Sequence, residues 1–194
     1  LRTPLTAISG AINTVLEQQD TLPPEKQREL LRSAEEESEW LIHMVENLLT
    51  ITRLNGDGET RLITQPEAVE EIMASAAAKF RRRYPDFAVQ VTAPDELLLV
   101  PMDAILMEQV LLNLLENAAL HGGRVKNITL AARRRNDKAE LRVEDDGVGL
   151  DSHGLENVFD GIRTRAEQTS SDRRNMGIGL SVCMSIVQAH GGTM

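Results

Sequence analysis

The sequence predicts an α+β fold in which an N-terminal helical hairpin precedes a two-layer α/β sandwich. Up to about Leu54 the apolar residues recur at helical spacing, and almost no strand pattern is present. After Gly58, short alternating segments typical of strands are mixed with separately placed helices. A chain of 194 residues that is 41% hydrophobic is long enough for one ordinary domain plus a smaller element.

The composition excludes several classes of protein. A net charge of −9 argues against general nucleic-acid binding, because phosphate contacts need clustered Lys and Arg. The single cysteine, Cys183, cannot form an internal disulfide, so a cysteine-stapled secreted domain is excluded. No apolar run approaches the roughly 20 residues that cross a bilayer, and no signal peptide is recognisable. We therefore expect a soluble chain from a reducing compartment, and a fragment of a longer protein, because it opens within a helix without an initiator Met.

Two helices are expected before residue 56. Thr21–Pro24 separates them, because tandem prolines remove backbone donors and force extended backbone. The second helix is predicted from about Glu25 to Leu54, and the turn-rich segment Asn55–Gly58 follows it. Each helix carries an apolar stripe, which in the first has steps of 3, 4 and 3, as in a coiled-coil seam. The stripes consist of Leu5, Ile8, Ile12 and Val15 in the first helix and of Ala34, Leu41, Val45 and Leu48 in the second.

These two stripes cannot form a closed core within one hairpin. The simplest completion is a homodimeric four-helix bundle through residues 1–54. The alternative is that the stripes pack onto the rest of the chain. We therefore expect residues 1–56 to form a dimerising hairpin and residues 59–194 to form the sandwich.

The pattern after Gly58 predicts a mixed set of strands and helices. Asp103 is a good N-cap for a strongly apolar helix, and Gly122-Gly123 closes that helix. The expected strands are Arg61–Thr64, Phe87–Val91, Leu97–Val100, Ile128–Arg133 and Ala139–Glu144. The expected helices run over about Pro66–Arg82, Asp103–His121 and Gly177–His190.

The segment Asp145–Gly149 reads D-x-G-x-G at the end of a predicted strand. Glycines at alternate positions let a flat ligand approach the backbone closely, while a carboxylate beside them accepts a hydrogen bond from an amino group. Taken alone, the pattern fits a plain turn equally well.

Two further patterns point to a phosphate ligand. Asn113 and Asn117 lie four residues apart on one face of the apolar helix. They are either a structural pair whose hydrogen bonds are made within the protein or a face that binds a ligand. An Asn carbonyl oxygen can bind Mg²⁺. Gly177 and Gly179 open a helix, where backbone N–H groups suit phosphate, although a flexible helix start is equally compatible. The order of Asn pair, D-x-G-x-G, polar stretch and Gly-x-Gly helix is far more specific than any one of its members.

With these motifs the sequence resembles the sensor histidine kinases of two-component signalling, over essentially its whole length. The matching segments, in chain order, are Leu1–Leu5 (end of the H-box), Glu108–Ala118 (N-box), Asp145–Gly149 (first glycine box), Val158–Asp160 (F-box), Gly177–Leu180 (second glycine box) and Val187–Gly192 (the segment that follows it). The resemblance implies a dimerisation and histidine-phosphotransfer hairpin followed by a catalytic ATP-binding domain of the Bergerat type.

The resemblance also implies roles for individual residues. Asn117 would hold Mg²⁺ on the triphosphate of ATP, with Asn113 near the same phosphates. Asp145 would accept a hydrogen bond from the adenine amino group, and Gly147 and Gly149 would give the base room. Gly177 and Gly179 would face the phosphates, and residues 160–176 would form the ATP lid. The other members of the nucleotide-binding set are His121, Phe159, Ile178 and Leu180.

Three positions depart from the family pattern. Leu120 stands where the N-box usually has Lys, so one phosphate-facing cation is lost. We interpret His121, which follows it, as a packed residue at the helix end rather than a catalyst. Ile162 replaces an aromatic of the F-box and Asn175 replaces the first glycine of the second glycine box, so the lid is expected to order less tightly.

The phosphoacceptor His of the H-box is expected two residues before Leu1. Thr3 then occupies the position four residues after it, whose residue in the family helps to orient water for dephosphorylation of the response regulator. The alternative for Thr3 is a helix-start hydroxyl bonded to its own backbone. The family implies a response regulator receiver domain as partner and, usually, a membrane-bound parent, so we expect this portion to be cytoplasmic.

Within the family, His43–Leu49 together with Thr52–Leu54 resembles the Kdp-type potassium-responsive kinases. Two other classes of function stay open. A GHKL-type ATPase such as gyrase has a Glu four residues before its magnesium-binding Asn, where this chain has Asn113. A nucleotide-sensing dimer scaffold without transfer activity is compatible with Leu120 and Asn175.

Overall fold

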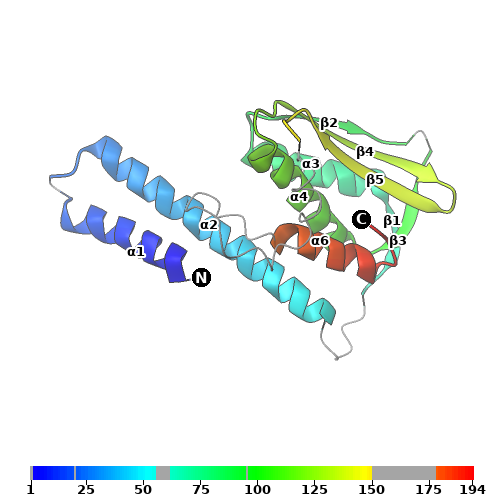
Figure 1. Cartoon of the computed structure of the whole chain (residues 1–194), viewed down its shortest axis with the longest axis horizontal. Helices are drawn as coiled ribbons and strands as arrows, with labels where there is room; N and C mark the ends of the chain where they lie inside the picture. The colour runs from blue at the N-terminus through cyan, green and yellow to red at the C-terminus, as the bar shows by residue number, and fades with distance from the viewer. Residues whose placement is uncertain (1, 20, 56–61, 95, 150–177) are drawn as a thin grey trace. The chain divides into compact units, whose positions relative to one another are not determined.

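The computed structural model describes residues 2–19, 21–55, 62–94, 96–149 and 178–194 (Figure 1). The chain divides into two compact units, Leu1–Thr52 and Arg53–Met194. The helix-and-strand order confirms the predicted α+β class, with a purely helical first part and a mixed second part. None of the helices in the described ranges combines the length and apolar character that a bilayer crossing requires.

The first unit consists of α1 (Arg2–Glu17) and most of α2 (Pro24–Asn55), which confirms the predicted hairpin. Pro4 is tolerated because it lies in the first turn of α1, where its missing N–H has no intrahelical partner anyway. The amide of Gln27 closes the connection by donating to the backbone oxygens of Gln19 (3.0 Å) and Leu22 (3.1 Å). The two hydrogen bonds of Gln27 therefore stabilise the connection between the helices at the tandem prolines.

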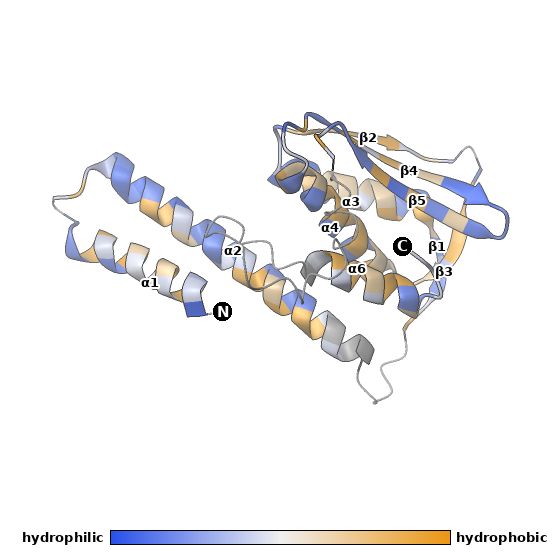
Figure 2. Cartoon of the chain, viewed as in Figure 1, coloured by the Kyte–Doolittle hydropathy of each residue, from blue (hydrophilic) through white to orange (hydrophobic). Residues whose placement is uncertain are grey.

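The hairpin exposes many large apolar side chains. Figure 2 shows apolar residues repeating along both helices. The exposed ones are Leu5, Ile12, Leu16, Leu31, Ile42, Val45, Leu48 and Leu49. Leu5, Ile12, Val45 and Leu48 belong to the two stripes predicted from sequence, so part of each stripe remains exposed in this single chain.

The second unit contains two small sheets and three described helices. Its elements are β1 (Gln65–Ala68), α3 (Val69–Arg83), β2 (Ala88–Thr92), β3 (Leu99–Met102), α4 (Ala104–His121), β4 (Asn127–Arg135), β5 (Lys138–Asp145) and α6 (Ile178–Ala189). The main sheet has the order β2-β4-β5, with β2 parallel and β5 antiparallel to β4, and β1 pairs with β3 in a separate antiparallel ribbon. Figure 1 shows the helices on one face of the main sheet, which makes the predicted two-layer sandwich.

The predicted bounds of three elements in this unit are wrong. The strand expected at Arg61–Thr64 lies instead at Gln65–Ala68, and the helix expected from Pro66 begins at Val69. The cause is the pairing of Pro66 with Pro101, since a two-stranded ribbon consists only of edge strands, where a proline need not donate. The same ribbon moves the strand expected at residues 97–100 to Leu99–Met102.

The core of the second unit lies between the main sheet and the helices. β4 alternates strictly, with Ile128, Leu130 and Ala132 turned inward, as the period of a half-buried strand requires. The largest fully buried side chains are Phe80, Met73, Leu111, Leu115, Ile128, Leu130, Ile186, Val69, Val182 and Cys183. Because α3, α4, β4 and α6 all contribute, the core fixes the elements that carry the candidate site.

Candidate functional site

α4 carries the predicted asparagine pair. Asp103 caps its N-terminus by accepting from the backbone N–H groups of Ile105 and Leu106, both at 3.1 Å, which confirms the predicted cap. Asn113 and Asn117 lie on one face of the helix, half-buried, and within the described residues the buried Nδ2 atom of each has no well-formed hydrogen bond, although the Asn113 side chain lies beside the Cys183 thiol. A buried unpaired amide is costly, so these two donors suit a ligand with acceptor oxygens.

The residues present fit a magnesium–phosphate group on chemical grounds. An Asn amide offers a donor and an acceptor, and rotation about its last side-chain bond exchanges them. Asn113 and Asn117 can therefore present N–H to phosphate oxygen or carbonyl oxygen to Mg²⁺. Because phosphate oxygens would supply other ligands, one Asn amide could hold Mg²⁺ without a cluster of protein carboxylates.

Two ion pairs set α4 against α3. Lys79 Nζ lies 2.6 Å from Glu108 Oε2, and Arg83 Nη1 lies 2.9 Å from Glu116 Oε1. Burial raises the pKa of Glu108, but hydrogen bonds from Lys79 and Ser75 outweigh it, and its pKa lies below the usual value. These pairs link α4 to α3 across the contact between the two helices.

The D-x-G-x-G segment forms a tight turn against the C-terminal end of α4. Asp145 Oδ1 accepts from the backbone N–H of Gly147 at 2.9 Å, and Val148 N–H donates to the oxygen of Gly122, the C-cap of α4, at 2.8 Å. A Cβ on Gly147 would lie 2.0 Å from that same Gly122 oxygen, so only glycine fits there. Gly149 has a φ of +71°, which glycine adopts without strain. The structure thus places Asp145 beside the C-terminal end of α4, the helix that carries Asn117.

Asp146 is a residue of this turn that the sequence reasoning missed. Its carboxylate accepts from the backbone N–H groups of Lys126 (2.8 Å) and Asn127 (3.1 Å) and from Asn127 Nδ2 (2.7 Å). The N–H groups of Lys126 and Asn127 hold the pKa of Asp146 below its usual range. The only available signal was a second aspartate beside the first, because its partners lie about 20 residues away in the sequence.

α6 packs against α4 and continues the site. Gly179 and Leu180 lie in its first turn, and a Cβ added to Gly179 would meet nothing within 4 Å. Cys183 is fully buried, its thiol donates to the backbone oxygen of Val110 at 3.7 Å, and burial raises its pKa to about 12. This cysteine is therefore a packing residue between the two helices.

His190 ties the end of α6 to the start of α4. Its Nε2 accepts from the backbone N–H of Asp103 at 3.0 Å, so Nδ1 carries the proton and donates to the oxygen of Ile186 at 2.7 Å. The imidazole thus connects the two helix ends in one defined tautomer.

Several other predicted residues have different outcomes. His121 is the last residue of α4, as expected, but it is exposed rather than packed, because the helix ends there at the surface turn of Gly122. Ile178 begins α6. Phe159, Gly177 and the lid at residues 160–176 lie outside the described residues, as do Ile162 and Asn175.

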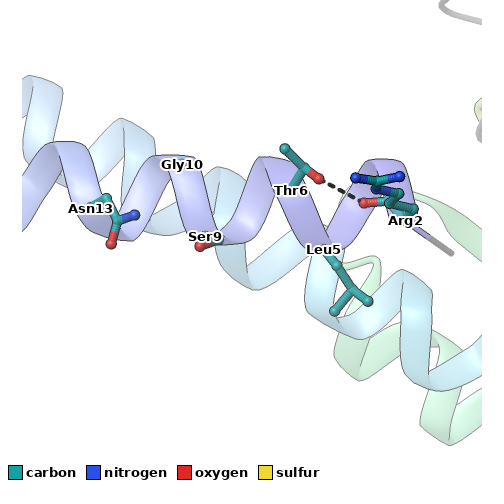
Figure 3. A pocket seen from close by; sticks show the side chains of 6 residues that line it. All are labelled: Arg2, Leu5, Thr6, Ser9, Gly10 and Asn13. Atoms are coloured by element: carbon teal, nitrogen blue, oxygen red, sulfur yellow. Dashed lines mark hydrogen bonds between the residues drawn. The ribbon is translucent and has the colours of Figure 1, made fainter.

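In the hairpin, Thr3 is an exposed residue of α1. A shallow groove runs along the same helix (Figure 3). It is lined by Arg2, Leu5, Thr6, Ser9, Gly10 and Asn13. Figure 3 shows the Thr6 hydroxyl donating to the Arg2 oxygen, at 2.9 Å, so this hydroxyl is turned back onto its own helix.

Two family models match segments of the chain. The His Kinase A (phospho-acceptor) domain matches residues 1–57, and the histidine kinase-, DNA gyrase B-, and HSP90-like ATPase matches residues 102–194. The chain belongs to the sensor histidine kinase family. Its relative "Sensor protein KdpD" from Clostridium acetobutylicum is 34% identical over 99% of this chain. This histidine kinase chain spans 21% of that relative's length.

Solved histidine kinases share the fold. Acinetobacter baumannii histidine kinase AdeS has a TM-score of 0.66 and 21% identity, over 97% of this chain and 85% of that one. Histidine kinase ThkA, solved in complex with response regulator protein TrrA, has a TM-score of 0.69 and 22% identity, over 98% of this chain and 52% of that one. The matches cover both units of this sensor kinase chain.

Proposed function

We propose that this chain is the kinase core of a two-component sensor that binds Mg-ATP and transfers its γ-phosphoryl group to a histidine. The observation that carries the proposal is the placement of Asn113 and Asn117 on the helix whose end abuts the Asp145 turn, with buried Nδ2 atoms that have no well-formed hydrogen bond within the described residues. The amides of Asn113 and Asn117 offer donors and acceptors for phosphate and metal. The turn beside them offers the Asp145 carboxylate and glycine backbone to a nucleotide base.

In this proposal each residue has a distinct task. Asn117 would hold Mg²⁺, with Asn113 beside the same phosphates, and the ion would neutralise charge on the phosphoryl oxygens. The carboxylate oxygen of Asp145 that Gly147 does not engage would accept from the adenine amino group. Gly177 and Gly179 would leave backbone N–H groups accessible to phosphate at the start of α6. Phosphoryl transfer needs mainly positioning and charge stabilisation, which these residues supply.

The hairpin would dimerise and receive the phosphoryl group. Its exposed apolar stripes support a homodimeric bundle through residues 1–54, because side chains such as Ile12 and Val45 are 40% and 44% exposed in the single chain. The acceptor histidine would precede Leu1 by two positions. The phosphoryl group would then pass to an Asp of a response regulator receiver domain, and the structure of ThkA with TrrA supports this class of partner.

The similarity to Sensor protein KdpD supports a Kdp-type assignment within the family. A Kdp-type kinase would respond to potassium, and this portion would be the cytosolic part of a membrane-bound sensor. Nucleic-acid binding is not part of the proposal, because the chain carries an excess of acidic residues.

Calorimetric titration of the whole chain with ADP and with a non-hydrolysable ATP analogue tests the proposal. Both nucleotides are expected to bind, and Mg²⁺ is expected to raise the affinity, because Asn117 would hold the ion and the ion would neutralise phosphate charge. GTP serves as the control ligand, since it lacks the 6-amino group that Asp145 would accept from. Absence of adenine-nucleotide binding, with and without Mg²⁺, overturns the proposed function.

Thr3 provides a test of the phosphotransfer half of the proposal. In protein extended upstream by its own encoded residues, Thr3→Ala is expected to slow regulator dephosphorylation about tenfold or more while autophosphorylation persists, because a positioned hydroxyl would orient the attacking water. The two rates are measured with labelled protein and purified regulator. Thr6→Ala is the matched control, since its hydroxyl bonds to Arg2 oxygen. Equal loss of both activities in Thr3→Ala would indicate a purely structural hydroxyl.

A further inference from the structure

The turn that carries Asp145 is fastened to the segment after α4 by bonds that the proposed function does not use. Asp146 N–H donates to the oxygen of Asn127 at 3.2 Å, and the Asp146 carboxylate accepts three N–H groups from Lys126 and Asn127. We name this set of contacts among Lys126, Asn127 and Asp146 the Asp146 clamp. It joins the start of β4 to the end of β5 beyond their last paired residues, Ile128 and Asp145.

The clamp leaves Asp145 little freedom. Asp145 and Asp146 share a peptide unit, so fixing Asp146 by its N–H and its carboxylate also fixes the backbone plane that follows Asp145. On the other side Asp145 lies in the ladder opposite Ile128, and its Oδ1 is held by Gly147 N–H. The hydrogen bonds of Asp146 therefore help to fix the orientation of Oδ2, the second carboxylate oxygen of Asp145.

The clamp is not a core element. Asp146 and Asn127 are both exposed, and neither contributes apolar burial. Hydrogen-bonded groups at the surface add little to global stability, whereas their geometry still sets the neighbouring backbone. The N–H groups of Lys126 and Asn127 keep the pKa of Asp146 low, so the clamp persists in its charged form at neutral pH.

We propose that Asp146 and Asn127 are a positioning pair for base recognition, which sets Asp145 to accept a hydrogen bond from the exocyclic amino group of adenine. The pair touches no part of the nucleotide and acts through Asp145. The inference rests on the proposed function, because it gives the clamp a role in the selectivity of that same site.

A reciprocal exchange of the two side chains isolates the pair. Asp146→Asn keeps an oxygen for the backbone N–H groups but sets an amide N–H₂ against that of Asn127. Asn127→Asp sets two carboxylates against each other. The double variant D146N/N127D restores one donor facing one acceptor, with the roles reversed, so recovery in it reports the pair itself.

The readout is the affinity of the whole chain for ADP relative to the diphosphate of unsubstituted purine riboside, which lacks the amino group. Each single variant is expected to bind ADP about tenfold more weakly while its affinity for the purine analogue changes less than about twofold. The double variant is expected to return to within about threefold of the wild-type ratio. Asp137→Asn, an exposed aspartate in the turn between β4 and β5, is the matched control and is expected to leave the ratio unchanged.

The outcomes separate this inference from the proposed function. A wild-type chain that binds neither nucleotide defeats the proposed function and the inference with it. A wild-type chain that binds ADP, with single variants that keep the wild-type ratio, defeats the inference alone. Single variants that weaken both ligands equally, without recovery in the double variant, would assign the pair a structural role and also overturn the inference. If a single variant fails to fold, the ratio in the double variant decides, because its pair is complementary again.

Discussion

A protein that comprises Leu1–Met194 alone is expected to bind ATP and yet acquire no label from γ-labelled ATP, whereas protein extended upstream by its own encoded residues becomes labelled. Phosphoryl transfer needs an in-line nucleophile, and the proposal assigns that role to an imidazole two residues before Leu1. Water is a poor substitute here, because a general base is required to remove its proton. Asn113 stands where an ATPase of this fold would have that base, and a neutral amide has no basic lone pair near neutral pH.

The label is measured after incubation with Mg²⁺ and γ-labelled ATP, with both protein termini verified by mass. On the extended protein it is expected to be acid-labile and base-stable, which is typical of phosphohistidine. The matched control is the extended protein carrying Asn117→Ala, which retains the acceptor and is expected to lose most of the label. Stable label on the shorter protein would place the acceptor inside residues 1–194. Rapid release of phosphate by the shorter protein would instead favour the ATPase hypothesis.

Asn117→Ala and Asp145→Ala are expected to weaken nucleotide binding in two different ways. Asn117→Ala should abolish the increase in affinity that Mg²⁺ produces, because it removes the carbonyl oxygen assigned to the ion. Asp145→Ala should lower the affinity about tenfold to a hundredfold with and without Mg²⁺, because a charged acceptor for the base is lost.

Calorimetric titration at zero and saturating Mg²⁺ separates these two signatures. Asp137→Ala is the control for the loss of an exposed carboxylate and is expected to bind as the wild type does. Thermal unfolding of each variant shows whether the fold is retained. Asn117→Ala is expected to be at least as stable as the wild type, since it removes a buried Nδ2 that has no hydrogen-bond partner among the described residues. Undiminished binding in both site variants would refute the site assignment.

Local signals in the sequence were sufficient for the two hairpin helices and for α4. The tandem prolines, the Asp103 cap and the spacing of Asn113 and Asn117 each depend on neighbours within a turn or two, and the structure has the helices where these signals put them. The alternation in β4 was likewise readable, because one face of that strand is buried.

Features that depend on distant partners were not predictable in the same way. The strand at Gln65–Ala68 exists because it pairs with Leu99–Met102, and nothing local in Gln65-Pro66-Glu67 favours a strand. The clamp at Asp146 requires donors about 20 residues earlier in the chain. His121 was expected to be a packed residue at the helix end, but the α4 residues that are buried in the core end with Ala118 and Ala119, and His121 is exposed.

The burial of Cys183 has a practical consequence for chemical labelling. It is the only cysteine of the chain, and thiol reagents attack the thiolate, which is scarce at neutral pH when the pKa is about 12. A cysteine introduced on the surface would therefore be the single reactive thiol of the folded protein, with no need to remove the native one. Conversely, Cys183 becomes accessible to an alkylating reagent only when α6 separates from α4. The alkylation rate of this native cysteine therefore reports how often these two helices of the candidate site separate.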